Sequence, residues 1–232
     1  MKPGQVMTRW WQDLVAGRLR TPQAIFRAAI SENPDPAQAG DRVFDLPEDG
    51  PTFDAPERLK APGFLRSPSY TVQLERADWN HCDPRLMYWA ARFVDAAKKR
   101  GIPLYVHCAL RGEAEQKRVY AAGNSRARYP SSAHNIGEAV DIVHGVFHRQ
   151  MTRDEWRYLH VLGQLVLDRV NAELPKAQKL NLTWGGNFRS LYDPAHWEVS
   201  DYRNRLRPIP DGPPKHYLPQ FIFRQWRLNR PS

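Results

Sequence analysis

The sequence predicts an α+β domain, a small antiparallel sheet flanked by helices, with further segments at both ends of the chain. Two observations favour this class. Short segments with the length of strands, each containing β-branched or aromatic residues, lie at 103–108, 139–143, 182–184 and 196–199. Longer stretches with the spacing or end signals of helices lie at 84–100, 113–122 and 152–171. Strands and helices that do not alternate regularly are typical of α+β domains.

The first elements of this domain lie between residues 70 and 101. We interpret the run 70–74 as a strand. The helix after it begins at Asp83 and Pro84, which cap and start it, and ends at Gly101. Its apolar residues recur at helical spacing, at Leu86, Met87, Ala90, Phe93, Val94 and Ala97.

Two more helices are predicted from their end signals. The stretch 113–122 is followed by Gly123, a usual residue just beyond a helix C-terminus. Thr152 and Glu155, three residues later, form the pattern of a capping box. This box begins a helix that we expect to run to about Asn171.

We divide the chain into four parts. Residues 1–33 read as two short amphipathic helices, which either pack on the main domain or serve as a targeting module. Residues 34–68 contain seven prolines and are interpreted as an irregular arm or linker. Residues 69–202 form the main domain. Residues 203–232 are a basic tail rich in proline and aromatic residues, which either packs its aromatics on the domain or binds a wall polymer, a membrane surface or a partner protein.

The charge of the chain is its unusual bulk property. An apolar content of 41% and a charged content of 25% are ordinary, but the net charge is +9. Such a charge attracts a polyanion, either nucleic acid or an anionic wall or lipid surface. The sequence holds no zinc-finger spacing, phosphate-binding loop or aromatic-basic RNA-binding segment. We therefore expect no nucleic-acid partner, and an anionic cell wall is the favoured polyanion.

The cysteines and the N-terminal residues bear on the compartment. Cys82 and Cys108 have no metal-binding spacing and are interpreted as free thiols. Charged residues interrupt the N-terminal stretch, so we expect no export signal. No apolar run is long enough to span a membrane. The sequence thus predicts synthesis in the cytoplasm, and we also expect a monomer.

Three residues have the chemistry of a catalytic metal site. Residues 139–143 are apolar except for Asp141, whose carboxylate would be costly in a core but not beside a metal. His134 precedes this strand, and His196 begins the last one. Catalytic zinc takes three ligands from His, Asp or Glu and keeps a fourth position for water. The sequence therefore predicts Zn²⁺ held by His134, Asp141 and His196 in a cleft of the sheet.

Longer patterns around these residues resemble a peptidase family. Ser-x-His-x-x-Gly-x-Ala-x-Asp in 132–141 and Asp-x-x-His-Trp in 193–197 resemble the M15 peptidases, typified by D-alanyl-D-alanine carboxypeptidases and dipeptidases and by phage L-alanyl-D-glutamate endopeptidases. The resemblance runs from about Glu75 to about Tyr202. Trp-Gly-Gly at 184–186 and an Asp at 193 are similar to the endopeptidase branch. The resemblance implies a zinc hydrolase acting on peptidoglycan stem peptides.

The resemblance also implies roles for residues near the metal. Arg111 would hold a substrate carbonyl or carboxylate, with Gln116 supporting it in the same wall of the site, and Ser132 would also bind substrate. Without the resemblance, the stretch around Arg111 is typical of a solvated helix face. Asp193 would be the general base, and Glu198 is the second candidate for that role.

Two other histidines are close in sequence to Asp141. His144 and His148 could line the cleft, although nothing in the pattern requires it.

These inferences predict a zinc metallopeptidase, either an endopeptidase or a D,D-carboxypeptidase. Asp193 would take the proton of a water activated by zinc, and Arg111 would polarise the peptide carbonyl. A basic enzyme of this kind suggests a phage or prophage lysin, or a virion-associated one. The alternative is a non-catalytic metal-containing structural or binding protein on the same fold, such as a phage particle component. Asp193 and Arg111 argue against it, because a structural zinc site needs no open position.

Overall fold

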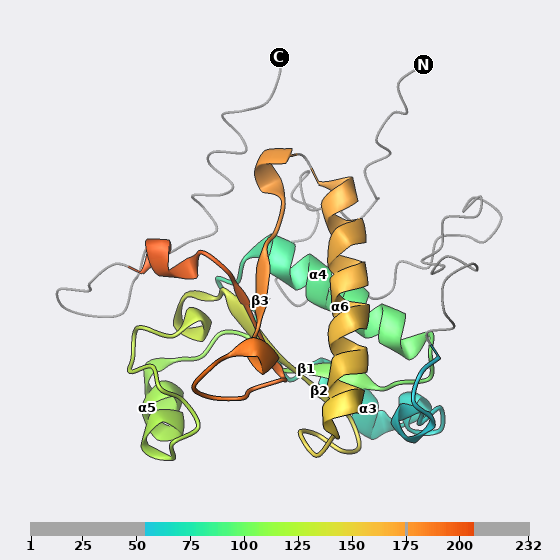
Figure 1. Ribbon diagram of the computed structural model, residues 1–232. Helices are drawn as coiled ribbons and strands as arrows, with labels where there is room; N and C mark the ends of the chain where they lie inside the picture. The colour runs from blue at the N-terminus through green and yellow to red at the C-terminus, as the bar shows by residue number, and fades with distance from the viewer. Residues whose placement is uncertain (1–53, 175, 207–232) are drawn as a thin grey trace, which may run out of the picture. The chain divides into compact units, whose positions relative to one another are not determined.

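The computed structural model describes residues 54–174 and 176–206, which are coloured in Figure 1. Four strands in this part form one sheet in the order β1-β2-β4-β3. They are β1 (Leu104–Cys108), β2 (Ala139–His144), β3 (Leu182–Trp184) and β4 (His196–Val199). Strand β4 pairs antiparallel with both β2 and β3. With the helices below, this confirms the predicted α+β class.

The α-helices are α3 (Pro68–Leu74), α4 (Pro84–Lys98), α5 (Glu113–Ala121) and α6 (Arg153–Glu173), the last being the long helix of Figure 1. Short 3₁₀ helices are η1 (Glu57–Leu59), η2 (Phe64–Arg66), η3 (Ala133–Ile136), η4 (Lys176–Gln178), η5 (Gly185–Asn187) and η6 (Tyr202–Arg205). None of the helices in the described ranges is long and apolar enough to cross a membrane.

The end signals read from the sequence are confirmed. Thr152 and Glu155 form the capping box of α6, in which each side chain accepts a hydrogen bond from the other residue's backbone N–H. Gly101 and Gly123 follow α4 and α5 with φ of 79° and 72°, in the left-handed region that glycine occupies without strain.

The strand expected at 70–74 is wrong, because this segment is helix α3. Ser67 is its N-cap, and the Ser67 hydroxyl accepts a hydrogen bond from the backbone N–H of Tyr70. Pro68 occupies the first turn, where its missing N–H costs nothing. The Ser-Pro pair was the available signal, and it outweighs the β-branched residues of the short run.

The chain divides into two compact units, each described separately here. Of the described residues, the first unit comprises 54–75, 88–105, 143–174 and 176–179, and the second comprises 76–87, 106–142 and 180–206. The predicted N-terminal helices within 1–33, most of the proline-rich arm and most of the basic tail lie outside the described residues.

The first unit has a largely apolar core. Its most buried side chains include Leu59, Tyr70, Trp89, Phe93, Ile102, Leu104 and Leu162. The indole of Trp89 in α4 donates to the carbonyl of Gly163 in α6 at 3.1 Å. Arg58 forms an ion pair with Glu155 at the start of α6. Apolar burial is the main stabilising term of such a unit.

The second unit contains the β2–β4–β3 pairings and a small core beneath η3. This core consists of Ala133, Ile136, Ala139 and Tyr202, with Leu206 packed against it. Arg205 of η6 binds both carboxylate oxygens of Glu138, the residue that precedes β2. The segment after β4 is therefore fastened to the elements that hold the polar site described next.

Candidate metal centre

Helix η3 fixes the backbone of His134. Ser132 caps the helix by accepting a hydrogen bond from the N–H of His134, while the Asn135 side chain accepts from the N–H of Ser132. Gly137 ends it with φ of 71°, and a Cβ there would collide with the backbone of His81 and Cys82. A side chain at position 137 would therefore displace η3.

The ring of His134 is oriented by a backbone carbonyl. Its Nδ1 lies 2.8 Å from the carbonyl oxygen of Ala109, which can only accept a hydrogen bond. Nδ1 therefore carries the proton, and Nε2 presents its lone pair on the other side of the ring. The imidazole is almost completely buried, at 2% exposure.

Strand pairing brings Asp141 and His196 together. They are direct partners in the β2–β4 register, and both are buried. The Nε2 of His196 lies 3.1 Å from Oε2 of Glu198, so that nitrogen donates to the carboxylate and Nδ1 presents a lone pair. Both imidazoles thus turn a bare nitrogen towards Asp141.

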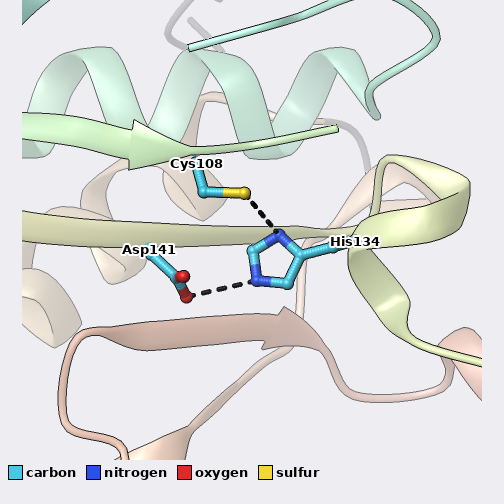
Figure 2. A group of neighbouring side chains, drawn as sticks. All are labelled: Cys108, His134 and Asp141. Carbon is cyan, nitrogen blue, oxygen red and sulfur yellow. Dashed lines mark hydrogen bonds and ion pairs between the residues drawn. The ribbon is translucent and has the colours of Figure 1, made fainter. Parts of the chain in front are cut away.

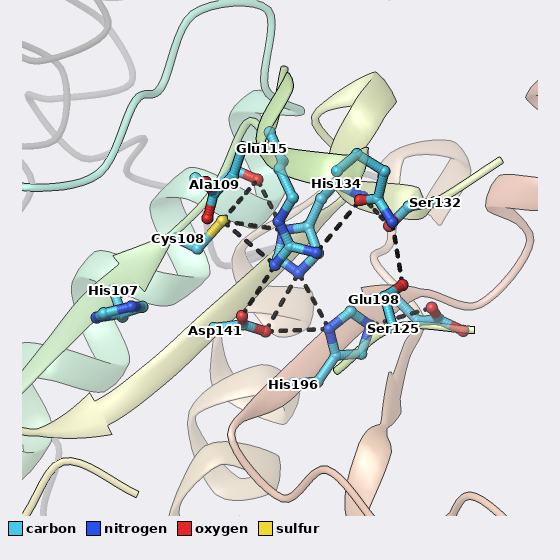
Figure 3. Close-up of polar contacts among 12 residues, drawn as sticks. His107, Cys108, Ala109, Glu115, Ser125, Ser132, His134, Asp141, His196 and Glu198 are labelled. Carbon is cyan, nitrogen blue, oxygen red and sulfur yellow. Dashed lines mark hydrogen bonds and ion pairs between the residues drawn. The ribbon is translucent and has the colours of Figure 1, made fainter. Parts of the chain in front are cut away.

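Three acceptor atoms face one another at the centre of Figure 3. Nε2 of His134 lies 3.2 Å from Oδ1 of Asp141 and 3.1 Å from Nδ1 of His196, which lies 3.1 Å from the same oxygen. These atoms form a nearly equilateral triangle. Lone pairs in this arrangement repel one another unless a cation lies between them.

The pKa shifts show the same attraction for positive charge. Burial opposes the charged ring of His134, but Asp141 and Cys108 outweigh it and raise its pKa to about 10. Burial likewise opposes the ionisation of Asp141, but His134 and His196 hold the pKa of its carboxyl well below the usual value. A proton and a metal ion would therefore compete for this site.

The triangle fits a tetrahedral zinc ion. Zinc binds imidazole nitrogen and carboxylate oxygen at about 2.0–2.2 Å, which separates neighbouring ligand atoms by about 3.3–3.6 Å in a tetrahedron. The observed separations of 3.1–3.2 Å are only slightly shorter. Two imidazoles and one carboxylate also leave one coordination position for water or substrate.

Asp193 lies beside this triangle on the loop between η5 and β4. One of its carboxylate oxygens is within 4.8 Å of ligand atoms of both Asp141 and His196. The side chain is half-buried rather than enclosed. It can therefore approach a water near the metal position.

Glycine allows the Asp193 loop to pack closely. A Cβ at Gly185 would collide with the carbonyl oxygen of Asp193 and lie 3.0 Å from Cβ of His196. The N–H of Asp193 donates to the carbonyl of Gly185 at 3.2 Å, and the Trp184 indole donates to the carbonyl of Pro194 at 2.8 Å. The Trp-Gly-Gly segment thus holds Asp193 close to His196, the last predicted ligand.

Arg111 lies behind Asp141. Its Nη2 is 3.3 Å from Oδ2 of Asp141, the oxygen that does not face the histidines, and its Nη1 donates to Oε1 of Gln116 at 3.3 Å. The side-chain Nε2 of Gln116 donates in turn to the carbonyl of Ala127 at 2.7 Å and to the hydroxyl of Ser125 at 3.0 Å. Arg111 therefore fixes the orientation of the Asp141 carboxylate.

A family comparison supplies the identity of this arrangement. Residues 125–199, which include His134, Asp141, Asp193 and His196, match the M15 family model described as D-alanyl-D-alanine carboxypeptidase. These residues, about a third of the chain, are similar to the M15 peptidase family. The predicted resemblance is confirmed over residues 125–199, and the match supports a metallopeptidase of the M15 type acting on peptidoglycan peptides.

The other comparisons add little to this M15 assignment. The crystal structure of the Serratia marcescens L-Ala D-Glu endopeptidase ChiX is similar with a TM-score of 0.42 and 22% identity, over 60% of this chain and 90% of that one. No curated protein matches the sequence.

Two residues expected to bind substrate have structural contacts in the M15 site. Gln116 is completely buried, and both ends of its amide are bonded within the protein, so it acts through Arg111 rather than on substrate directly. Ser132 is also buried and caps η3. Their contacts indicate that both residues support the centre from behind.

His144 and His148 are in the first unit, whereas the M15 site residues are in the second. His144 donates to the carbonyl of Leu59 and accepts from the N–H groups of Val146 and Phe147. His148 contacts the hydroxyl of Tyr105. Their contacts are structural.

Cys108 is a neighbour of the centre that sequence reasoning did not place there. It is a free thiol, as predicted, at the end of β1. Its Sγ lies 3.7 Å from Nδ1 of His134, on the opposite side of the ring from Asp141 (Figure 2). Cys108, His134 and Asp141 offer ligand atoms within 4.8 Å of one another, so the thiol is a further candidate metal ligand beside the triangle. Its position three residues before Arg111 was the only signal.

Proposed function

We propose that the chain is a zinc metallopeptidase in which His134, Asp141 and His196 hold the metal and Asp193 is the general base. The convergence of three lone-pair atoms at 3.1–3.2 Å, with the Asp193 carboxylate beside them, carries this proposal. When bound, zinc would supply a Lewis acid that polarises a peptide carbonyl and acidifies water.

The chain's own residues would perform the proton transfers. Asp193, on a loop held by Gly185 and Trp184, would accept the proton of the attacking water and pass it to the leaving amine. Arg111 has an exposed fraction of 11% for its side chain, so its guanidinium can add positive charge at one side of the site. The same guanidinium keeps Oδ1 of Asp141 directed at the histidines.

We further propose that the substrate is the stem peptide of peptidoglycan and that the enzyme is a lysin of phage or prophage type, made in the cytoplasm and acting on the wall after release. The M15 match supports the substrate, and the net charge of +9 supports attraction to an anionic wall.

Digestion of purified peptidoglycan tests the activity. The full chain would be incubated with and without a chelator, and the released peptides and their amino termini would be identified by mass spectrometry. New termini that vanish with chelator and return with zinc would establish the metallopeptidase, and their identity would distinguish an endopeptidase from a D,D-carboxypeptidase. No release with any divalent metal would favour the non-catalytic binding protein.

A further inference from the structure

Glu198 and His196 lie two residues apart on β4. Side chains at this spacing point to the same face of a sheet. Oε2 of Glu198 is 3.1 Å from Nε2 of His196. Figure 3 shows the two side chains next to each other. The contact is on the side of the ring away from the triangle, which Nδ1 faces. Glu198 therefore cannot reach the metal position past the His196 ring.

The carboxylate of Glu198 is buried with little other compensation. The residue has an exposed fraction of 6%. Among residues 54–174 and 176–206, the basic side chain that forms an ion pair with it is that of Arg203, whose Nη1 lies at 4.0 Å on a side chain that is 71% exposed. A buried carboxylate is costly unless it is hydrogen-bonded. The bond to His196 is thus its main short contact among those recorded for the described residues.

The two histidines of the triangle are held by different acceptors. His134 donates to a neutral carbonyl, that of Ala109, whereas His196 donates to a carboxylate. A carboxylate on the outer nitrogen fixes the tautomer and makes the inner nitrogen a stronger electron donor. The same side chain would therefore orient His196 and raise its strength as a ligand.

We propose that Glu198 is a positioning residue, which holds the Nε2–H of His196 and so presents Nδ1 to the metal. This inference deepens the proposed function and rests on its metal site. It separates the two carboxylates of the last segment. Asp193 lies beside the ligand atoms and handles protons, whereas Glu198 lies behind a ligand and sets metal affinity.

Zinc affinity of the full-length protein tests the proposal without reference to catalysis. Metal-stripped wild type, Glu198→Gln and Glu198→Ala would compete for zinc with a chromophoric chelator at one pH. We expect Glu198→Ala to bind zinc on the order of 10- to 100-fold more weakly. Glu198→Gln should fall between the two, because an amide oxygen still accepts the N–H but carries no charge.

Glu155→Gln is the matched control, since Glu155 is a glutamate of similar burial in the other unit. Its zinc affinity should stay within about twofold of wild type. Equal losses in Glu155→Gln and Glu198→Gln would mean that only stability had changed, and would overturn the proposal. If Glu198→Ala does not fold, the comparison between the two Gln variants still decides.

Two further measurements sharpen the test. Nitrogen-15 NMR of the zinc-loaded wild type should show His196 with metal on Nδ1 and a proton on Nε2, and metal on Nε2 would contradict the proposal. Saturating zinc should restore kcat in Glu198→Gln. An unchanged zinc affinity with an unrecoverable kcat would instead make Glu198 the base. The wild type could bind zinc and cleave no peptidoglycan while the Glu198 variants bind zinc more weakly. That result would disprove the proposed function but not the positioning role of Glu198.

Discussion

His144 in the first unit and His134 in the second are both buried imidazoles within ten residues of each other, yet they have opposite chemistry. Every nitrogen of His144 is bonded to the backbone, to Leu59 on one side and to Val146 and Phe147 on the other. Burial lowers its pKa, so the ring stays neutral. His134 has one nitrogen bonded to the backbone, while the other faces two more acceptors, and its pKa rises to about 10.

The difference shows how a candidate metal ligand can be distinguished from a core histidine. Burial and residue type are the same at both positions, so neither identifies the ligand. What distinguishes His134 is an inner nitrogen whose neighbours are also acceptors. Backbone groups satisfy both nitrogens of His144 in the first unit. The three facing acceptor atoms of His134, Asp141 and His196 in the second unit are instead satisfied by a cation.

The largest expected effect is the loss of zinc binding and activity when His134 is replaced by alanine, with the same replacement of His144 as the comparison. His134→Ala should abolish tight zinc binding and lower peptidase activity by more than about 10³-fold, because two ligands do not hold a catalytic zinc. His144→Ala should lower the free energy of unfolding by about 1–3 kcal/mol, since three backbone groups lose their hydrogen-bond partner. This variant should still bind zinc. Metal content after gel filtration and thermal melts measure both. Loss of zinc from folded His144→Ala would break the comparison.

Asp193→Ala should show the next largest effect. We expect kcat to fall about 10²- to 10⁴-fold, because proton transfer is lost, while zinc affinity stays near wild type. Kinetics on purified stem peptides and a chelator competition would separate the two quantities. A variant that retained both zinc and near-full activity would rule out Asp193 as the base.

Gly185→Ala tests whether the close packing of the Asp193 loop against Gly185 is needed for stability and activity. Its Cβ would collide with the Asp193 carbonyl, so we expect a loss of about 1–3 kcal/mol in stability and a lower kcat. Gly63→Ala in the first unit is the control, because open space surrounds a Cβ there. Chemical denaturation and kinetics test the pair. Equal behaviour of the two variants would show that the loop has room to move.

The smallest effect concerns the pH dependence of the first unit. Burial opposes the ionisation of Glu155, but Arg58 and the N–H of Thr152 outweigh it and hold its pKa below the usual 4.5. A depressed pKa adds stability above the unfolded value, and this stability is lost as pH falls through the folded value. Glu155→Gln should therefore cost about 1 kcal/mol at pH 7, and the difference should shrink below about pH 4.5. Melting at several pH values would show whether the two curves converge.

The sequence predicted most elements because their end signals are local. Gly101, Gly123 and the Thr152–Glu155 box each act within one turn, so one chain suffices to read them. The run 70–74 failed because a cap competed with β propensity. Helix η3 was not predicted, although Ser132 and Asn135 form its capping box.

The site was predictable only in its residue types. Spacing singled out His134, Asp141 and His196, but which nitrogen faces the metal depends on Ala109 and Glu198, and those contacts exist only after the strands pair. Gln116 was predicted to support Arg111 in the same wall of the site, and its Oε1 accepts a hydrogen bond from Nη1 of Arg111. Its burial results from the loop at Ser125 and Ala127, which no periodic pattern announces.

The contacts of η6 with η3 and with Glu138 determine how far the protein can be truncated from its C-terminal side without losing the site. The family match ends at residue 199, but Tyr202 and Leu206 pack under η3, and Arg205 binds Glu138 just before β2. A protein cut at 199 would expose the underside of the helix that carries His134. We therefore expect a minimal active fragment to extend through Leu206. Proteolytic removal of η6 would destabilise η3 and so abolish metal binding.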